Sequence, residues 1–113
     1  MRVLHVIPSL DQSDGGPSRA VVEMCRALLD AGEQVEIAAT VSDQAGTVAT
    51  PDLPAHLFPR RTLFGRAAEY KYSPELAAWL DKNVRHYDVL HIHAVFNYST
   101  HAAARAAMRH GTP

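Results

Sequence analysis

Two glycines stand where the sequence could bind an anion. Gly15 and Gly16 follow an apolar run and come directly before an amphipathic pattern that opens with Pro17. Free N–H groups at a helix N-terminus attract phosphate, and glycine lets an anion approach the backbone closely. A plain turn is the competing interpretation, because neither GxGxxG nor GxxxxGK[ST] is present. A dinucleotide-dependent dehydrogenase and a P-loop NTPase are therefore both disfavoured.

A second polar group spans a predicted strand end and the helix that follows it. It contains His91, His93, Asn97, Tyr98 and Ser99. The H-x-H spacing could provide a metal pair, but no cysteine or acidic residue nearby offers further ligands, so we expect no metal. We predict that His91 is a satisfied core histidine. His93 is the better site candidate, because ligands of parallel sheets bind at the carboxyl ends of strands.

A third segment, residues 60–72, mixes basic and aromatic side chains. It could hold an acidic or sugar acceptor, although a solvated loop that packs back on the sheet is the more common case. The single cysteine, Cys25, falls at an apolar position of a predicted helix and is expected to be a buried, unreactive thiol.

These residues depend on alternating strands and helices for their positions. Apolar, β-branched runs predict strands over residues 2–7, 34–41, 55–58 and 88–92. Three-to-four apolar spacing with capping residues predicts helices from Pro17 to a left-handed cap at Gly32, from a cap at Ser73 to about His86, and from a cap at Ser99 or Thr100 to Gly111. In the first helix we expect Ala20, Val21, Met24, Cys25, Leu28 and Leu29 to be buried. The pattern indicates an α/β chain, a Rossmann-like three-layer α/β/α sandwich with a mostly parallel sheet of about four strands.

Composition restricts the class of protein. The chain has 113 residues, of which 47% are apolar and 20% charged, with a formal net charge of −1. It is too apolar for a disordered chain, and its nearly neutral charge speaks against a nucleic-acid module, which would have to use the basic segment from Arg60 to Lys71. The N-terminal apolar run is too short for a signal peptide or a bilayer span, so we expect a cytoplasmic location. Because the alternation stops after a helix, we expect residues 1–113 to be a single, partial domain.

Four stretches together carry a resemblance to a known family. They are MRVLHVIPSL, GGPSRAVVEMCRALLDAGEQVEI, YSPELAAWL and YDVLHIHAVFNYSTHAAARAAMRHGTP. In this order they resemble the N-terminal Rossmann-like domain of family 4 glycosyltransferases, which have the GT-B fold. The resemblance covers nearly the whole chain and is weakest between Ser42 and Arg66.

The resemblance implies a function and site residues. Such enzymes transfer a sugar from a nucleotide-sugar donor to an acceptor with retention of configuration and without an essential metal, and their N-terminal domain mostly holds the acceptor. By this resemblance, Gly15 and Gly16, supported by Arg19, face the donor diphosphate. His93 and residues 97–99 (Asn97, Tyr98 and Ser99) border the acceptor, which is a glycan, a lipid-linked molecule or a small molecule.

The same resemblance implies that parts of the enzyme lie elsewhere. The catalytic residues are expected beyond Pro113, and the second domain that binds the nucleotide-sugar is absent, so we expect the chain to be inactive by itself. A parent hexosyltransferase of glycan biosynthesis would be cytoplasmic or peripheral at the inner face of the membrane, and a truncated sheet could associate through its open edge. The alternative is a stand-alone flavodoxin-like binding or regulatory module without transferase activity.

Overall fold

The computed structural model describes residues 1–10, 16–41, 53–59, 73–93 and 98–113. Within them lie β1 (Arg2–Ser9), α1 (Gly16–Asp30), β2 (Gln34–Val41), β3 (Ala55–Pro59), α3 (Pro74–Asn83), the 3₁₀ helix η2 (Val84–His86), β4 (Val89–Ile92) and α4 (Tyr98–His110). The strands form one parallel sheet in the order β3-β2-β1-β4. The predicted α/β, Rossmann-like class is confirmed. The predictions for residues 42–52 and 60–72 lie outside the described residues.

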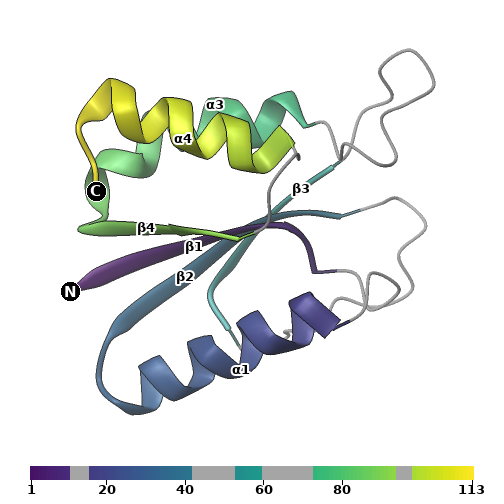
Figure 1. Ribbon diagram of the computed structural model, residues 1–113, viewed down its shortest axis with the longest axis vertical. Coiled ribbons are helices and arrows are strands. Elements are labelled where there is room, and N and C mark those ends of the chain that lie inside the picture. Colours follow the sequence, from purple (N-terminus) through teal and green to yellow (C-terminus); the bar gives the residue numbers. More distant parts are fainter. Residues whose placement is uncertain (11–15, 42–52, 60–72, 94–97) are drawn as a thin grey trace.

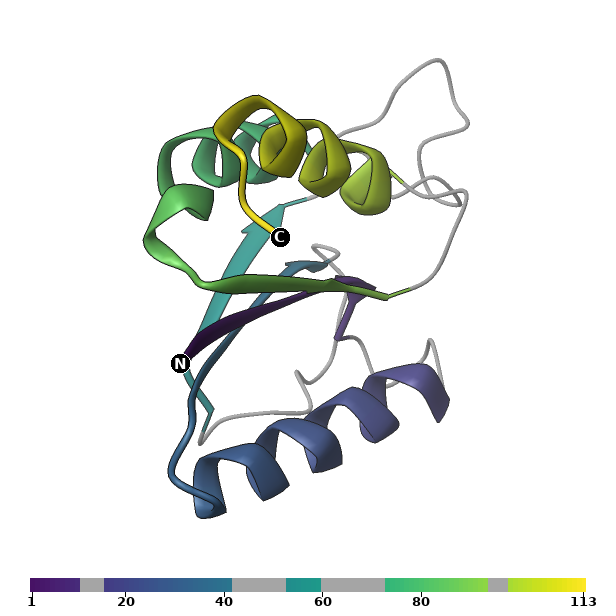
Figure 2. The ribbon, with the colours of Figure 1, turned by 60° about the vertical axis from the view of Figure 1, so that its left-hand side comes forward.

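Helices cover both faces of the sheet. Figure 1 shows α1 on one face and α3 with α4 on the other, and the rotated view in Figure 2 shows the same three layers. Strand residues alternate between the two faces. Leu4, Val6 and Ala38 therefore enter the core under α3 and α4, whereas Ile7 and Ile37 enter the core under α1. We call these two sides the α3/α4 face and the α1 face.

The first helix buries a slightly different stripe from the predicted one. Val21, Val22 and Cys25 are buried, but Met24 is 40% exposed and Ala20 is exposed as well. The prediction was wrong at these two positions. On the helix surface Met24 lies at the margin of the side that packs on the sheet, and Ala20 lies farther from that side. The predicted end of the helix is confirmed, since Gly32 has a φ of 92° and the N–H of Glu33 donates to the carbonyl of Leu28.

The last helix begins one to two residues before its predicted caps. Ser99 and Thr100 lie inside the first turn of α4, because the helix already starts at Tyr98. Its predicted end is confirmed: Gly111 has a φ of 68°, and the N–H of Thr112 donates to the carbonyl of Ala107. The basic residues of its last turn also bind Asp81 on α3, with Arg109 at 2.6 Å and His110 at 3.1 Å. These contacts tie the C-terminus of α4 to α3.

The predicted cap of α3 is confirmed at Ser73. Its hydroxyl accepts a hydrogen bond from the N–H of Leu76, and Pro74 occupies the first turn. The fully buried Leu76 and Leu80 of this helix then face the sheet. The cap therefore fixes where α3 begins and which of its residues reach the core.

We expect Ser73→Ala to lower the free energy of unfolding by about 1 kcal/mol, because the buried N–H of Leu76 loses its acceptor. Urea denaturation followed by the fluorescence of the single tryptophan, Trp79, measures the change. Ser73→Thr, which keeps a hydroxyl, is the matched control and should retain most of the stability. Equal stability of the alanine variant and the wild type would show that the cap contributes nothing.

Candidate functional site

The topology selects one place where the sheet can receive a ligand. From β1 the chain passes through α1 to β2 on one side of β1, whereas from β3 it returns through α3 to β4 on the other side. The strand order therefore reverses between β1 and β4, and in open α/β sheets ligands bind beyond the carboxyl ends of the strands at such a reversal. We call the side of the sheet where the strands end the carboxyl edge.

The α-helices begin at the carboxyl edge, and two of them, α1 and α4, follow the strands β1 and β4 that flank the reversal of strand order. In Figures 1 and 2 the first turns of α1 and α4 lie at the end of the sheet toward which β1 and β4 run. Each helix directs its free N–H groups and the positive end of its dipole toward this edge. Anions are thus favoured on both sides of the reversal between β1 and β4.

The predicted diphosphate residues lie at the start of α1. Gly16 is the first residue of that helix, and Arg19, which is exposed, follows within the first turn. Gly15, like Asn97 of the second group, lies outside the described residues. Gly16 and Arg19 therefore lie at the carboxyl edge, where helix N–H groups and a guanidinium are available to a phosphate.

His93 is held firmly against the neighbouring strand. Its backbone N–H donates to the carbonyl of Val6 at 2.8 Å, and its Nε2 lies 2.9 Å from Nδ1 of His5. Burial, together with repulsion from His91, lowers the pKa of His93 to about 4. Burial, and then repulsion from His93 and His91, lowers the pKa of His5 to about 4 as well. Both rings are therefore neutral at pH 7.

The prediction for His91 was wrong, and sequence reasoning missed His5. His91 is exposed, whereas His5, which the sequence presents only as an interruption of an apolar run, is 1% exposed. The two residues face each other in the register of β1 and β4, and β4 lies at the margin of the described sheet, where α1 does not cover it. The repeated apolar-His pattern of the two strands was the signal that could have linked them.

The structure separates His93 from the next two acceptor candidates. Leu90 and Ile92 pack into the core of the α3/α4 face. Because strand residues alternate between faces, His91 lies on the α1 face, and His93 stacks beside it there. Tyr98 instead packs against the core of the α3/α4 face and lines a groove between α3 and α4. Ser99 is fully buried, and among the described residues its hydroxyl has no hydrogen-bond partner.

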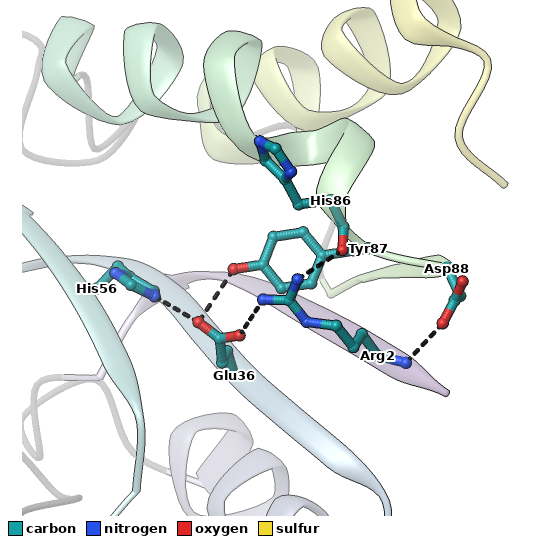
Figure 3. Close-up of polar contacts among 6 residues, drawn as sticks. All are labelled: Arg2, Glu36, His56, His86, Tyr87 and Asp88. Atoms are coloured by element: carbon teal, nitrogen blue, oxygen red, sulfur yellow. Dashed lines mark hydrogen bonds and ion pairs between the residues drawn. The ribbon is translucent and has the colours of Figure 1, made fainter.

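A second polar cluster lies at the opposite, amino end of the strands. Figure 3 shows Glu36 of β2 surrounded by Arg2, His56 and Tyr87, which we call the Glu36 cluster. Arg2 donates to Glu36 Oε2 at 3.1 Å, while Glu36 Oε1 lies 3.0 Å from the Tyr87 hydroxyl and 2.7 Å from His56 Nε2. Sequence reasoning missed this cluster as well. Its place away from the carboxyl edge indicates a structural role.

Cys25 matches the expectation of an unreactive thiol. It is 1% exposed, and burial raises the pKa of the thiol to about 11. The thiolate that a nucleophile or metal ligand requires is therefore scarce at pH 7.

Among the described residues, none of the helices has the length and hydropathy needed to cross a membrane.

One comparison with known families matches most of the chain. Residues 15–113 match the family described as "Glycosyl transferase 4-like domain". The matched range begins at Gly15 and includes α1, every later strand and both candidate groups at the carboxyl edge. No curated protein matches the chain in sequence.

Proposed function

The chain belongs to the family of glycosyltransferase 4-like domains, and from this premise we propose that it is the acceptor-side domain of a retaining glycosyltransferase. The enzyme transfers a sugar from a nucleotide-sugar donor to a glycan, a lipid-linked or a small-molecule acceptor. The family match over residues 15–113 is the observation that carries the proposal. The reversal of strand order between β1 and β4 supports it, because that is where an α/β sheet binds its ligand.

The donor diphosphate is assigned to the start of α1. Residues 15 and 16 bring backbone N–H groups close to the phosphates, and the positive end of the helix dipole stabilises their charge. Arg19 adds a guanidinium within the same turn. As the bond between sugar and diphosphate breaks, negative charge grows on the leaving phosphate. Donors that are already oriented toward it lower the barrier.

The acceptor is assigned to the carboxyl end of β4. His93 stands directly after this strand and carries a neutral imidazole, because burial holds its pKa at about 4. A neutral imidazole can accept a hydrogen bond from a sugar hydroxyl or donate one to it. The proposal also assigns residues 97–99 to the acceptor side. Of these, Tyr98 lies at the groove between α3 and α4, apart from His93, whereas Ser99 is fully buried and supports the site from within the core.

Several further parts of the proposal concern the enzyme as a whole. A second domain binds the nucleotide-sugar, the transfer step uses no metal cofactor, and the chain by itself does not turn over substrate. The enzyme works in the cytoplasm or at the inner face of the membrane. Where an open edge of the sheet remains uncovered, chains can associate through it.

The test compares the 113-residue chain with the product of the complete open reading frame. Both are incubated with a panel of nucleotide-sugars and with glycan, lipid-linked and small-molecule acceptors, and products are identified by NMR of the anomeric proton. Transfer with retention by the complete protein, and none by the chain, supports the proposal. An inverted product contradicts the retaining mechanism, and transfer by the chain contradicts the need for a second domain. Absence of transfer by the complete protein contradicts the function.

We expect Arg19→Gln to weaken the binding of a nucleoside diphosphate to the complete protein about tenfold. One hydrogen bond to a charged group contributes about 1.5–3 kcal/mol, and tenfold corresponds to about 1.4 kcal/mol. Isothermal titration calorimetry at low salt measures the Kd. The matched control is Arg85→Gln, which removes an exposed arginine from η2, before the start of β4. Equal Kd values for the two variants would remove Arg19 from the site.

A further inference from the structure

Three histidines from two adjacent strands meet on the α1 face of the sheet. His5 on β1 and His91 on β4 are partners in the strand register, and His93 follows immediately after β4. Their ring centroids lie 4.1 Å apart for His91 and His93, 4.9 Å for His5 and His91, and 5.2 Å for His5 and His93. One ring nitrogen from each residue lies within 4.8 Å of the others. We call these three residues the histidine cluster.

The hydrogen bonding of the histidine cluster is incomplete. Nδ1 of His5 pairs with Nε2 of His93, but Nε2 of His5 is buried and has no partner among the described residues. A buried polar atom without a partner is costly, and its presence calls for a ligand or ion that would complete it. His5 itself is 1% exposed, so bulk water does not satisfy it.

The chemistry of the cluster is that of a transition-metal site. All three side chains are imidazoles, the ligand that zinc, copper and nickel share, and within the described part of the chain no carboxylate joins the group to favour magnesium or calcium. His91 is exposed and provides a route from solvent.

We propose that His5, His91 and His93 together bind one divalent transition-metal ion of the Zn²⁺ class. Bonds of 2.0–2.1 Å place the nitrogens of a tetrahedral zinc site about 3.4 Å apart, and one ring nitrogen from each of the three histidines lies within 4.8 Å of the others, so small rotations of the rings bring them onto one ion. The fourth position is left to water or another small ligand. The ion joins β1 to β4 beside the point where the strand order reverses, so it acts as a cross-link of the two strands. It takes no part in the proposed sugar transfer.

The third ligand explains why the sequence did not reveal the site. The third ligand, His5, lies 88 positions from His93 in the chain. Only the parallel pairing of β1 with β4 brings the three residues together. The site does not rest on the proposed function, because it requires neither nucleotide-sugar nor acceptor.

The experiment titrates the complete, tag-free protein with Zn²⁺ in a calorimeter and with Co²⁺ as a spectroscopic probe. We expect one ion per chain and the visible absorption of Co²⁺ in a tetrahedral, nitrogen-rich site. His91→Ala and His93→Ala should each weaken binding by about a hundredfold or more, because loss of a ligand costs at least as much as loss of a residue that orients one. Bound Zn²⁺ should also raise the thermal unfolding temperature of the wild type.

The matched control is His101→Ala, which removes an exposed histidine of α4 outside the cluster and should leave the Kd unchanged. His5→Ala removes a buried side chain and can unfold the chain, so the test relies on His91 and His93. The proposal is overturned if the wild type binds no Zn²⁺, or if His91→Ala and His93→Ala bind it as tightly as His101→Ala. Neither result bears on sugar transfer, which the earlier activity assay tests separately.

Discussion

Leu80→Ala is expected to lower the free energy of unfolding by about 2–5 kcal/mol, the largest loss of stability that we predict for a single substitution. Leu80 is fully buried, in the core formed by α3, α4 and the α3/α4 face of the sheet. Alanine at this position removes apolar contacts and leaves a cavity that the rigid sheet and the two helices cannot close. A domain of this size has only about 5–15 kcal/mol of stability, so this loss is a large part of the total.

Urea denaturation followed by Trp79 fluorescence measures this loss. The tryptophan ring packs near His56 and Phe58, with centroids 4.5 Å and 5.7 Å away, so its emission reports whether α3 remains on β3. Met108→Ala is the matched control, because Met108 is a large apolar residue on a helix but is 84% exposed. It should change stability by less than about 0.5 kcal/mol. A loss below about 1 kcal/mol for Leu80→Ala would contradict the core described above.

Glu36→Gln is expected to cost about 1–3 kcal/mol at pH 7, because it removes the charge that the Glu36 cluster is built around. The carboxylate accepts hydrogen bonds from Arg2 at the start of β1 and from the hydroxyl of Tyr87, which follows η2. It also contacts His56 of β3 (Figure 3). The guanidinium of Arg2 also stacks 4.9 Å from the ring of Tyr87. Loss of one carboxylate therefore loosens three segments at once.

The same substitution should remove part of the acid sensitivity of the protein. Burial raises the pKa of Glu36, but the hydrogen bonds from His56, Arg2 and Tyr87 outweigh it and hold the pKa below the ordinary value of 4.5. The folded state thus binds this proton less readily than the unfolded state does. The carboxylate stabilises the fold fully above pH about 4.5, and this stabilisation disappears as the pH falls through the lower, folded pKa.

Unfolding curves of the wild type and of Glu36→Gln between pH 3 and 7 test the direction of this pH dependence. The stability difference between the two proteins should be greatest at neutral pH and should shrink below pH about 4.5. Glu23→Gln, which removes an exposed carboxylate from α1, should show little difference at any pH. If the stability difference between the wild type and Glu36→Gln grew as the pH fell, the Glu36 cluster would not favour the charged carboxylate.

The proposed function and the histidine cluster meet at His93. In the proposed transfer its imidazole borders the acceptor, whereas in the metal site it is one of three ligands. The two roles can be separated, since metal binding is measured with Zn²⁺ alone and transfer with nucleotide-sugars.

Local sequence determined most of the secondary structure. Strand β2 spans the predicted residues 34–41, because an apolar, β-branched run between a helix cap and a polar segment can bury both faces only in a sheet. Gly32 and Gly111 end their helices in the left-handed conformation, which glycine adopts without steric cost. Ser73 caps α3 for the equally local reason that its hydroxyl reaches an N–H three residues ahead. The order of these elements was enough to predict the fold class, and the four sequence stretches taken together carried the family resemblance.

The candidate sites depend instead on which strands become neighbours. Strand β4 pairs with β1 and not with β3, its predecessor in the chain, and this pairing alone places His5 beside His91 and His93. Burial of Met24 was predicted wrongly, since helical periodicity defines an apolar stripe but only the packing of the helix on the sheet decides how wide the buried part of that stripe is. In the sequence Glu36 is one polar residue within a predicted strand, and nothing beside it in the chain indicates its partners. Only the folded chain brings three side chains from distant segments to its carboxylate. Contacts between residues that are distant in the chain follow from the strand order of the sheet, and local sequence patterns carry little information about that order.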